Sequence, residues 1–143
     1  MIEMILAMNL NNTIGDKNGL TWKAPNDMRW FKDKTKGRTL ICGRKTYNTL
    51  PESFKKSHEI IVLSRTGDYG ITNVLKLDNP LIIGGGEIYS TFFPYADRVY
   101  LSIIPQIYYG DTMIEINWNE WNVVYSEGYD DALCMILEKI KGE

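Results

Sequence analysis

Apolar stretches that lead directly into glycine or polar turns constrain the fold of this 143-residue chain more than any other feature. Residues 39–43 form such a stretch and are followed by a helical segment; residues 81–83 are followed by three glycines and a second helical segment. Residues 1–7 and 60–63 are similar apolar runs. Strands that alternate with helices predict a single α/β domain over residues 1–143, with ligands at the carboxyl ends of the strands.

The rest of the chain gives weaker signals. Alternating apolar residues predict a strand over residues 98–104. Residues 121–126 and 133–140 predict the two arms of a terminal hairpin, although residues 132–141 also fit the apolar stripe of a helix. Two shorter segments complete the pattern, a polar loop over residues 51–59 and a short strand over residues 74–77.

Composition excludes several classes of protein. The formal charge of -2 shows no basic excess, which argues against a nucleic-acid surface. No apolar run reaches transmembrane length, so we expect a cytoplasmic protein without membrane contact. The single histidine, His58, leaves no clustered zinc site, and we expect no metal. Cys42 and Cys134 lie in separate apolar runs and are expected to be buried thiols.

Asp27 is the most informative charged residue. Pro25 suits the first turn of a helix, and Asp27 follows two residues later. Lys32 and Lys34 are predicted to face solvent, so a carboxylate in this apolar setting lacks a partner that a ligand with adjacent N–H donors could supply. The alternative is an exposed first-turn aspartate favoured by the helix dipole. The expected apolar neighbours of Asp27 are Trp22, Met28, Trp30 and Phe31.

Two glycine turns are candidate phosphate sites. Residues 43–46, GRKT, follow an apolar strand and open a helix, but the spacing does not match a nucleotide-hydrolysing loop. Residues 84–86 are three glycines, and Tyr89 occupies the third glycine position of a dinucleotide-binding motif. Ser64 and Arg65, just beyond another strand, could grip a second phosphate. Each feature by itself also fits an ordinary turn.

Taken in order, these motifs resemble the dihydrofolate reductase family over nearly the whole chain. The resemblance implies an eight-stranded, mostly parallel sheet with an antiparallel C-terminal strand and flanking helices, and it favours strands over a helix at the C-terminus. It also implies a monomeric enzyme that reduces 7,8-dihydrofolate to tetrahydrofolate with NADPH. The matching residues are Ala7, Ile14, Gly15, Trp22, Pro25, Asp27, Trp30, Phe31, Lys32, Thr35, residues 43–46, residues 60–64, residues 83–86, Tyr89 and residues 110–112.

The resemblance assigns catalytic roles to four residues. Asp27 is expected to bind the amino group and ring N–H of the pterin and to favour protonation at N5, while hydride reaches C6. A water admitted beside Leu20 is expected to carry the proton, and Trp22 to hold an ordered water. Ser102 matches a threonine that hydrogen-bonds the carboxylate in the family.

The remaining site residues follow from the same resemblance. Substrate-binding residues are expected to be Ile5, Leu6, Ala7, Asp27, Met28, Phe31, Leu50, Lys56, Ile83, Tyr89 and Ser102. Cofactor-binding residues are expected to be Ala7, Ile14, Gly15, Asn18, Leu20, Gly43, Arg44, Lys45, Thr46, Leu63, Ser64, Arg65, Ile83, Gly84, Gly85, Gly86, Glu87, Ile88, Tyr89 and Thr112. Gly84 and Gly85 are expected to be joined by a cis peptide bond.

The sequence also departs from the family pattern. Thr21 replaces the proline that usually precedes Trp22, and the arginine for the glutamate tail of the substrate is absent, with Lys56 or His58 in its place. Lysine offers a point charge without the planar fork of arginine. Two rival functions remain at this point, a pyrimidine reductase of the same fold and a non-catalytic protein that binds NADPH or folate.

Overall fold

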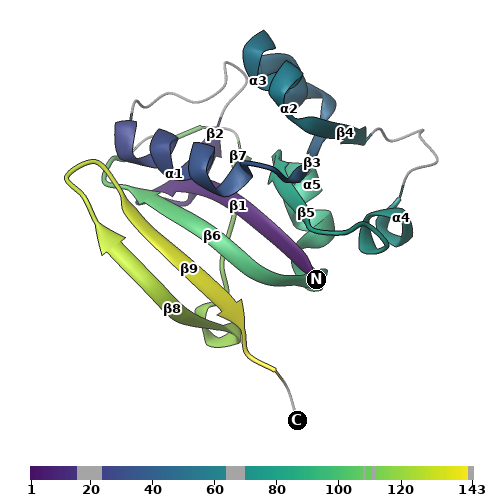
Figure 1. Cartoon of the computed structure of the whole chain (residues 1–143). Coiled ribbons are helices and arrows are strands. Elements are labelled where there is room, and N and C mark those ends of the chain that lie inside the picture. The colour runs from purple at the N-terminus through teal and green to yellow at the C-terminus, as the bar shows by residue number, and fades with distance from the viewer. Residues whose placement is uncertain (16–23, 64–69, 108, 111, 142–143) are drawn as a thin grey trace.

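A twisted sheet forms the centre of the molecule (Figure 1). The computed structural model describes residues 1–15, 24–63, 70–107, 109–110 and 112–141. Seven of the described strands form this sheet in the order β4-β3-β5-β1-β6-β9-β8, and β2 pairs with β7 separately. The strands are β1 Ile2–Asn9, β2 Thr13–Gly15, β3 Thr39–Gly43, β4 Glu59–Leu63, β5 Pro80–Gly84, β6 Ala96–Ile104, β7 Thr112–Met113, β8 Trp121–Gly128 and β9 Leu133–Lys139.

The sheet is mostly parallel, as the sequence predicts. Strands β4, β3, β5, β1 and β6 run parallel to their neighbours, and β9 pairs antiparallel with β6. A short turn joins β8 and β9 into an antiparallel hairpin, and β9 lies between β6 and β8. The C-terminal ambiguity is thereby resolved in favour of strands.

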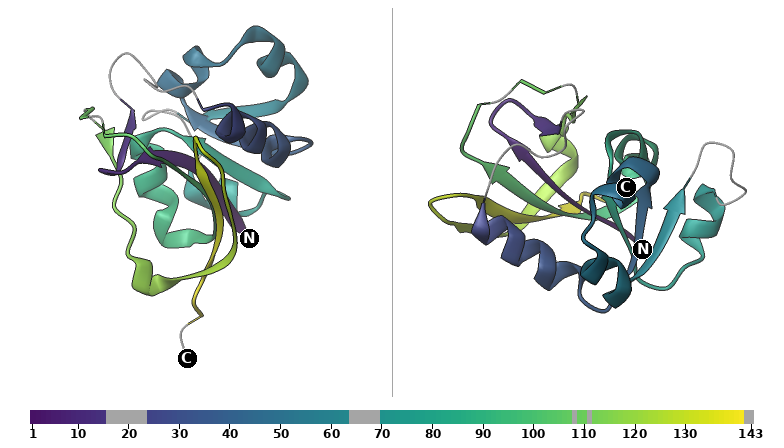
Figure 2. Two further views of the ribbon diagram at one scale, coloured as in Figure 1. Left: turned by 90° about the vertical axis from the view of Figure 1, so that its left-hand side faces the viewer. Right: turned by 90° about the horizontal axis from the view of Figure 1, so that it is seen from above.

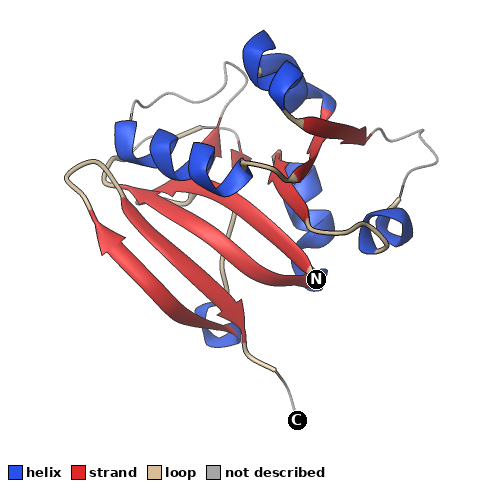
Figure 3. Ribbon diagram, viewed as in Figure 1, coloured by secondary structure: helices blue, strands red, loops and turns tan. Residues whose placement is uncertain are grey.

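Helices cover both faces of the sheet. Figure 2 shows α1 on one face and α5 on the other, and Figure 3 separates the helices from the strands by colour. Side chains alternate along β1, so Ile5 joins the core on the α1 side and Met4 joins the core on the α5 side. The helices are α1 Pro25–Thr35, α2 Arg44–Thr49, α3 Glu52–Ser57, α4 Ile71–Leu75 and α5 Gly86–Phe92, with 3-10 turns η1 Phe93–Tyr95 and η2 Trp118–Glu120.

Two local predictions are wrong. The segment expected as a polar loop contains α3. Pro51 precedes this helix in an extended conformation, and the helix begins at Glu52. The segment expected as a short strand overlaps α4, where the N–H groups of Asn73 and Val74 donate to the carbonyl of Gly70. Val74 is fully buried, and one helical turn is enough to bury it, so a four-residue apolar signal does not separate the two conformations.

Both cysteines are free and buried, as expected from their apolar surroundings. Over the described residues, no helix is long and apolar enough to cross a membrane. No group of three or more His, Cys, Asp or Glu side chains gathers there in a way that could hold a metal ion.

Glu3 is the one charged residue of β1, and it is buried at the centre of an ionic network. Arg38 Nη1 lies 2.6 Å from Glu3 Oε1, and Arg98 Nη1 lies 3.2 Å from Glu3 Oε2. The Tyr100 hydroxyl donates to Glu3 Oε1 at 3.1 Å, and Arg98 also pairs with Glu138 at 2.8 Å. One buried carboxylate therefore joins β1, β6 and the segment after α1.

We expect Glu3→Gln to lower the free energy of unfolding by about 2–4 kcal/mol, because it leaves Arg38 without its buried anion. Urea unfolding followed by circular dichroism measures this change. Glu52→Gln is the matched control, since Glu52 pairs with Lys55 at 3.3 Å but is 79% exposed, and we expect a change below about 0.5 kcal/mol. Equal effects of the two substitutions would contradict the role of the Glu3 network.

Candidate active site

Asp27 and Ser102 meet at one end of the sheet. Asp27 lies in the first turn of α1, which begins at Pro25 as predicted, and its side chain is half-buried. Ser102 lies on β6 and is completely buried. The Ser102 hydroxyl hydrogen-bonds the Asp27 carboxylate. The structure thus brings two of the predicted catalytic residues into contact.

The pKa of Asp27 is raised above its ordinary value. Burial is the largest cause, the hydrogen bond from Ser102 opposes it, and the negative charge of Asp131 raises the pKa further. No positive group contributes to this shift, so the described protein leaves the carboxylate without a cation. This setting favours the first interpretation of Asp27, a carboxylate awaiting a ligand with N–H donors, over a solvated aspartate at a helix start.

Asp27→Asn is expected to raise the melting temperature of the ligand-free protein at neutral pH by about 2–4 °C. Because the folded-state pKa of Asp27 lies above the unfolded value, ionisation of this group costs stability as the pH rises through the folded pKa. The difference should vanish below about pH 4, where Asp27 is protonated in both states. Calorimetry across pH measures this. Asp33→Asn, 72% exposed on the same helix, should change little, and an unchanged melting temperature for Asp27→Asn would contradict the raised pKa.

Apolar side chains predicted to line the substrate pocket gather on the α1 side of the sheet. Ile5, Ile83, Phe31 and Leu50 belong to one cluster there. Ala7 and Trp30 both pack against the neighbouring cluster, and Met28 is 57% exposed at the surface of α1. Leu6 is the exception, because side chains alternate along β1 and the Leu6 side chain packs in the cluster of the opposite face.

Tyr89 connects the two neighbouring strands that carry Ile5 and Ile83. Its hydroxyl lies 2.7 Å from the carbonyl oxygen of Ile5 and 2.9 Å from that of Ile83, and its single proton is shared between them. Burial raises the pKa of Tyr89, and the negative charge of Asp27 raises it further. The hydroxyl therefore stays protonated and holds the carbonyl groups of β1 and β5 close to the Asp27 site.

Lys34 does not lie on the solvent side as predicted. Its side chain is 25% exposed, and its Nζ lies 4.6 Å from the ring centroid of Trp30 and 5.6 Å from that of Tyr100. The reason is that a lysine stem can lie back along a helix onto the residue four positions earlier, with its ammonium over an aromatic face. Lys32 is exposed, as expected.

A glycine cradle lies where β5 passes into α5. Gly84 has φ +134°, and a Cβ placed there would lie 3.2 Å from Thr46 Oγ1 and 3.4 Å from the Tyr89 hydroxyl. The peptide bond between Gly84 and Gly85 is cis, as expected. A Cβ on Gly85 would also lie 3.2 Å from Thr46 Oγ1. The Thr46 hydroxyl of α2 therefore lies close to the backbone of Gly84 and Gly85. Only glycine at these two positions leaves this backbone accessible to a ligand.

The same cradle extends to the next glycines. A Cβ on Gly86 would lie 2.6 Å from Thr112 Cγ2 and 3.9 Å from Ile14 Cδ1. A Cβ on Gly43 would lie 3.3 Å from Ile88 Cγ1. Predicted cofactor residues from β2, β3, β5 and β7 therefore lie around the same stretch of glycine backbone.

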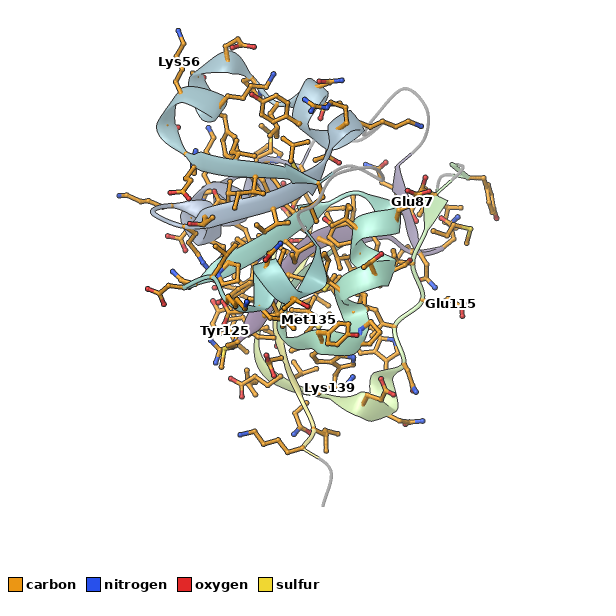
Figure 4. All side chains as sticks on the ribbon, turned by 90° about the vertical axis from the view of Figure 1, so that its right-hand side faces the viewer. Lys56, Glu87, Glu115, Tyr125, Met135 and Lys139 are labelled. Carbon is orange, nitrogen blue, oxygen red and sulfur yellow. The ribbon has the colours of Figure 1, made fainter. Side chains whose placement is uncertain are left out.

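Other predicted cofactor residues lie around or outside this cradle. Arg44 is exposed, with its guanidinium carbon 5.8 Å from the ring centroid of Tyr47. Lys45 is exposed, Leu63 is buried, and Glu87 is exposed in the first turn of α5 (Figure 4). The predictions for Asn18, Leu20, Trp22, Ser64 and Arg65 lie outside the described residues.

The two candidates for the substrate tail have different settings on and after α3. Lys56 is exposed and points away from the ribbon (Figure 4). His58 stacks on Phe54 with ring centroids 4.0 Å apart, and its Nδ1 lies 2.9 Å from the carbonyl oxygen of Phe54. Phe54 in turn stacks on Phe31, at 5.7 Å. Of these two candidates, only His58 is thus connected through aromatic contacts to Phe31, a predicted substrate-binding residue.

Sequence reasoning missed three residues beside Asp27. Cys134 on β9 lies opposite Ser102, with its sulfur 3.6 Å from the Ser102 hydroxyl. Asn26 and Asp131 hydrogen-bond each other next to Asp27. The only available signal was the pair of aspartates, 130–131, between the arms of the terminal hairpin, and aspartate in a turn ordinarily indicates turn geometry alone.

Comparisons with known proteins agree with this geometry. A family model described as dihydrofolate reductase matches residues 1–135. The dihydrofolate reductase of Bacillus subtilis is 36% identical over 89% of this chain and 83% of its own, and that of Haemophilus influenzae is 32% identical over 87% and 86%. A dihydrofolate reductase from Enterococcus faecalis, solved in complex with NADP(H) and RAB-propyl, superposes with a TM-score of 0.82 at 25% identity, over 99% of this chain and 97% of that one.

Proposed function

The chain belongs to the dihydrofolate reductase family, and we propose from its site that it reduces 7,8-dihydrofolate to 5,6,7,8-tetrahydrofolate with NADPH. The observation that carries this function is the setting of the Asp27 carboxylate. Ser102 hydrogen-bonds it, the apolar cluster of Ile5 and Phe31 lies on the same side of the sheet, and no positive group is among the causes of its raised pKa. A pterin ring offers an amino group and a ring N–H side by side. These two donors match the two oxygens of one carboxylate.

Asp27 would bind and orient the substrate. Its carboxylate accepts the two pterin hydrogen bonds, while Ser102 fixes the carboxylate from the protein side. The negative charge favours a proton at N5 of the ring, and a water is a better carrier of that proton than Asp27 itself, because Asp27 engages the opposite edge of the pterin. Ile5, Phe31 and Leu50 supply apolar contacts to the flat ring and the benzoyl group.

The cradle fits the cofactor because its backbone is left open by glycine. Gly84, Gly85 and Thr46 would hold the pyrophosphate through N–H groups and a hydroxyl, and Ile14 and Thr112 would lie on the nicotinamide side. Bound NADPH supplies the hydride that C6 of the pterin receives, and the protein supplies placement and a water-poor pocket. Arg44 would contribute to binding of the adenosine phosphate, together with Ser64 and Arg65.

The tail of the substrate requires a positive or hydrogen-bonding group near the pocket. Stacking through Phe54 to Phe31 supports His58 as the residue beside the pocket wall, whereas Lys56 could reach the tail only by turning back from solvent. A monomeric state and a cytoplasmic location stay predictions from the sequence.

The rival functions make different demands on the site. A pyrimidine reductase of the same fold has no need of a carboxylate matched to a pterin, and a non-catalytic binding protein has no need of Asp27 and the cradle together. Steady-state assays of NADPH oxidation with dihydrofolate, and separately with a ribosylated aminopyrimidine, distinguish them. We expect turnover with dihydrofolate only; turnover with the pyrimidine only, or with neither, would overturn the proposal.

A further inference from the structure

The terminal hairpin is fastened to the first turn of α1. Asp131, in the turn between β8 and β9, accepts a hydrogen bond from the backbone N–H of Asn26 at 3.0 Å and another from Asn26 Nδ2 at 2.8 Å. These two residues are 105 positions apart in the chain. Ala24, at the start of α1, provides no side-chain cap of its own. Asp131 therefore supplies from a distant segment the N-terminal cap that the helix lacks.

The position of this cap is significant because Asn26 immediately precedes Asp27. Restraint of the Asn26 backbone restrains the turn from which Asp27 projects toward Ser102. The hairpin brings a second contact to the same place, since Cys134 on β9 touches the Ser102 hydroxyl. The Asp27 carboxylate is thus supported by α1, β6 and the hairpin.

Asp131 also places a negative charge near Asp27. Hydrogen bonds from Asn26 hold the pKa of Asp131 below its ordinary value, so it is ionised wherever Asp27 titrates. Its charge is one cause of the raised pKa of Asp27. The other titratable groups facing these two carboxylates are Arg29 on α1, which faces Asp131, and Tyr89 and Cys134, whose own raised pKa values include the charge of Asp27.

We propose that Asp131 is a positioning residue of the reductase, which fixes the first turn of α1 against the terminal hairpin and lays a second negative charge beside Asp27. This inference rests on the proposed function. The alternative is a cap that stabilises the fold and has no influence on the reaction.

The first test is the pH profile of kcat/KM for dihydrofolate in Asp131→Asn. Removal of the Asp131 charge leaves less negative charge to favour the proton at N5 of the pterin, so the midpoint at which the rate falls with rising pH should move to lower pH. This shift should shrink at high salt, because the charge is exposed to screening. Asp130→Asn is the matched control: it removes one charge from the exposed neighbouring position of the same turn, and its midpoint should stay close to wild type.

The second test separates positioning from charge. We expect Asn26→Ala, which keeps the Asp131 charge, to lower kcat/KM about 3- to 10-fold without moving the midpoint. Asp131→Ala should show the loss and the shift together. The double variant should lose no more activity than Asp131→Ala, because the hydrogen bond that Asn26→Ala removes is made to Asp131. Should Asp131→Ala fold poorly, Asn26→Ala and Asp131→Asn still decide the question.

The outcomes distinguish this inference from the function on which it rests. Absence of wild-type turnover under the same conditions would defeat the proposed function itself. An active wild type, with an unshifted midpoint in Asp131→Asn and full activity in Asn26→Ala, would defeat the role of Asp131 alone.

Discussion

We expect Asp27→Asn to lower the rate of dihydrofolate reduction at neutral pH by about 100-fold or more. Asparagine keeps the size of the side chain and can accept from Ser102, but it lacks the negative charge that binds two pterin donors and favours a proton at N5. The loss should be smaller in acid, where more of the substrate is already protonated in solution. Steady-state rates of NADPH oxidation from acidic to neutral pH measure both effects.

The control for this substitution is Asp33→Asn, which lies on the same helix, is 72% exposed and pairs with Lys34. It should retain nearly full activity. The melting temperature provides a second check. We expect Asp27→Asn to melt at a higher temperature than wild type at neutral pH, and unfolding would then not explain its loss of activity. Wild-type rates in Asp27→Asn would contradict the role assigned to this carboxylate.

Gly84→Ala is expected to weaken NADPH binding at least about 10-fold. The new methyl group meets the Thr46 hydroxyl at 3.2 Å, and the backbone of residue 84, at φ +134°, is one that alanine rarely adopts. Both effects displace the backbone that forms the cradle. Fluorescence titration with NADPH, in the absence of substrate, measures the affinity without depending on turnover.

Gly37→Ala separates these two causes. Gly37 also has a positive φ, of +72°, but a Cβ there has no neighbour within 4 Å. It should lower stability and leave the affinity for NADPH unchanged. Equal losses of affinity in the two variants would indicate that general destabilisation, and not closure of the cradle, is responsible.

The sequence predicted the parts of the fold that local patterns encode. Apolar runs gave the strands β3, β4 and β5, and the proline and acidic residue of the first turn gave the start of α1. The prediction failed at α3 and α4, where segments this short carry little local signal. At α4 the burial of Val74 outweighs local propensity, and α3 begins directly after Pro51.

The site was predictable to a similar degree. Asp27, Thr46 and the glycines follow from motifs at strand ends and helix starts, whereas Ser102 was implied by the resemblance to the family. The structure places Ser102 beside Asp27 and Thr46 beside the glycines. The support from Asp131 could not be foreseen, because a contact between positions 105 apart depends on how the hairpin folds back over the sheet. The contact of Lys34 with Trp30 was missed for a related reason, since a charged residue was assigned to solvent without regard to its apolar stem.

The most direct test of the proposed reaction follows the hydrogen itself. Purified wild-type protein is mixed with dihydrofolate and NADPH that carries deuterium at the transferable position of its nicotinamide, and the folate product is examined by mass spectrometry and NMR. The proposed function predicts tetrahydrofolate with one deuterium at C6, formed in equal amount to the NADPH consumed. Consumption of NADPH without deuterium in the folate, or no consumption by a folded protein that binds NADPH, would contradict it.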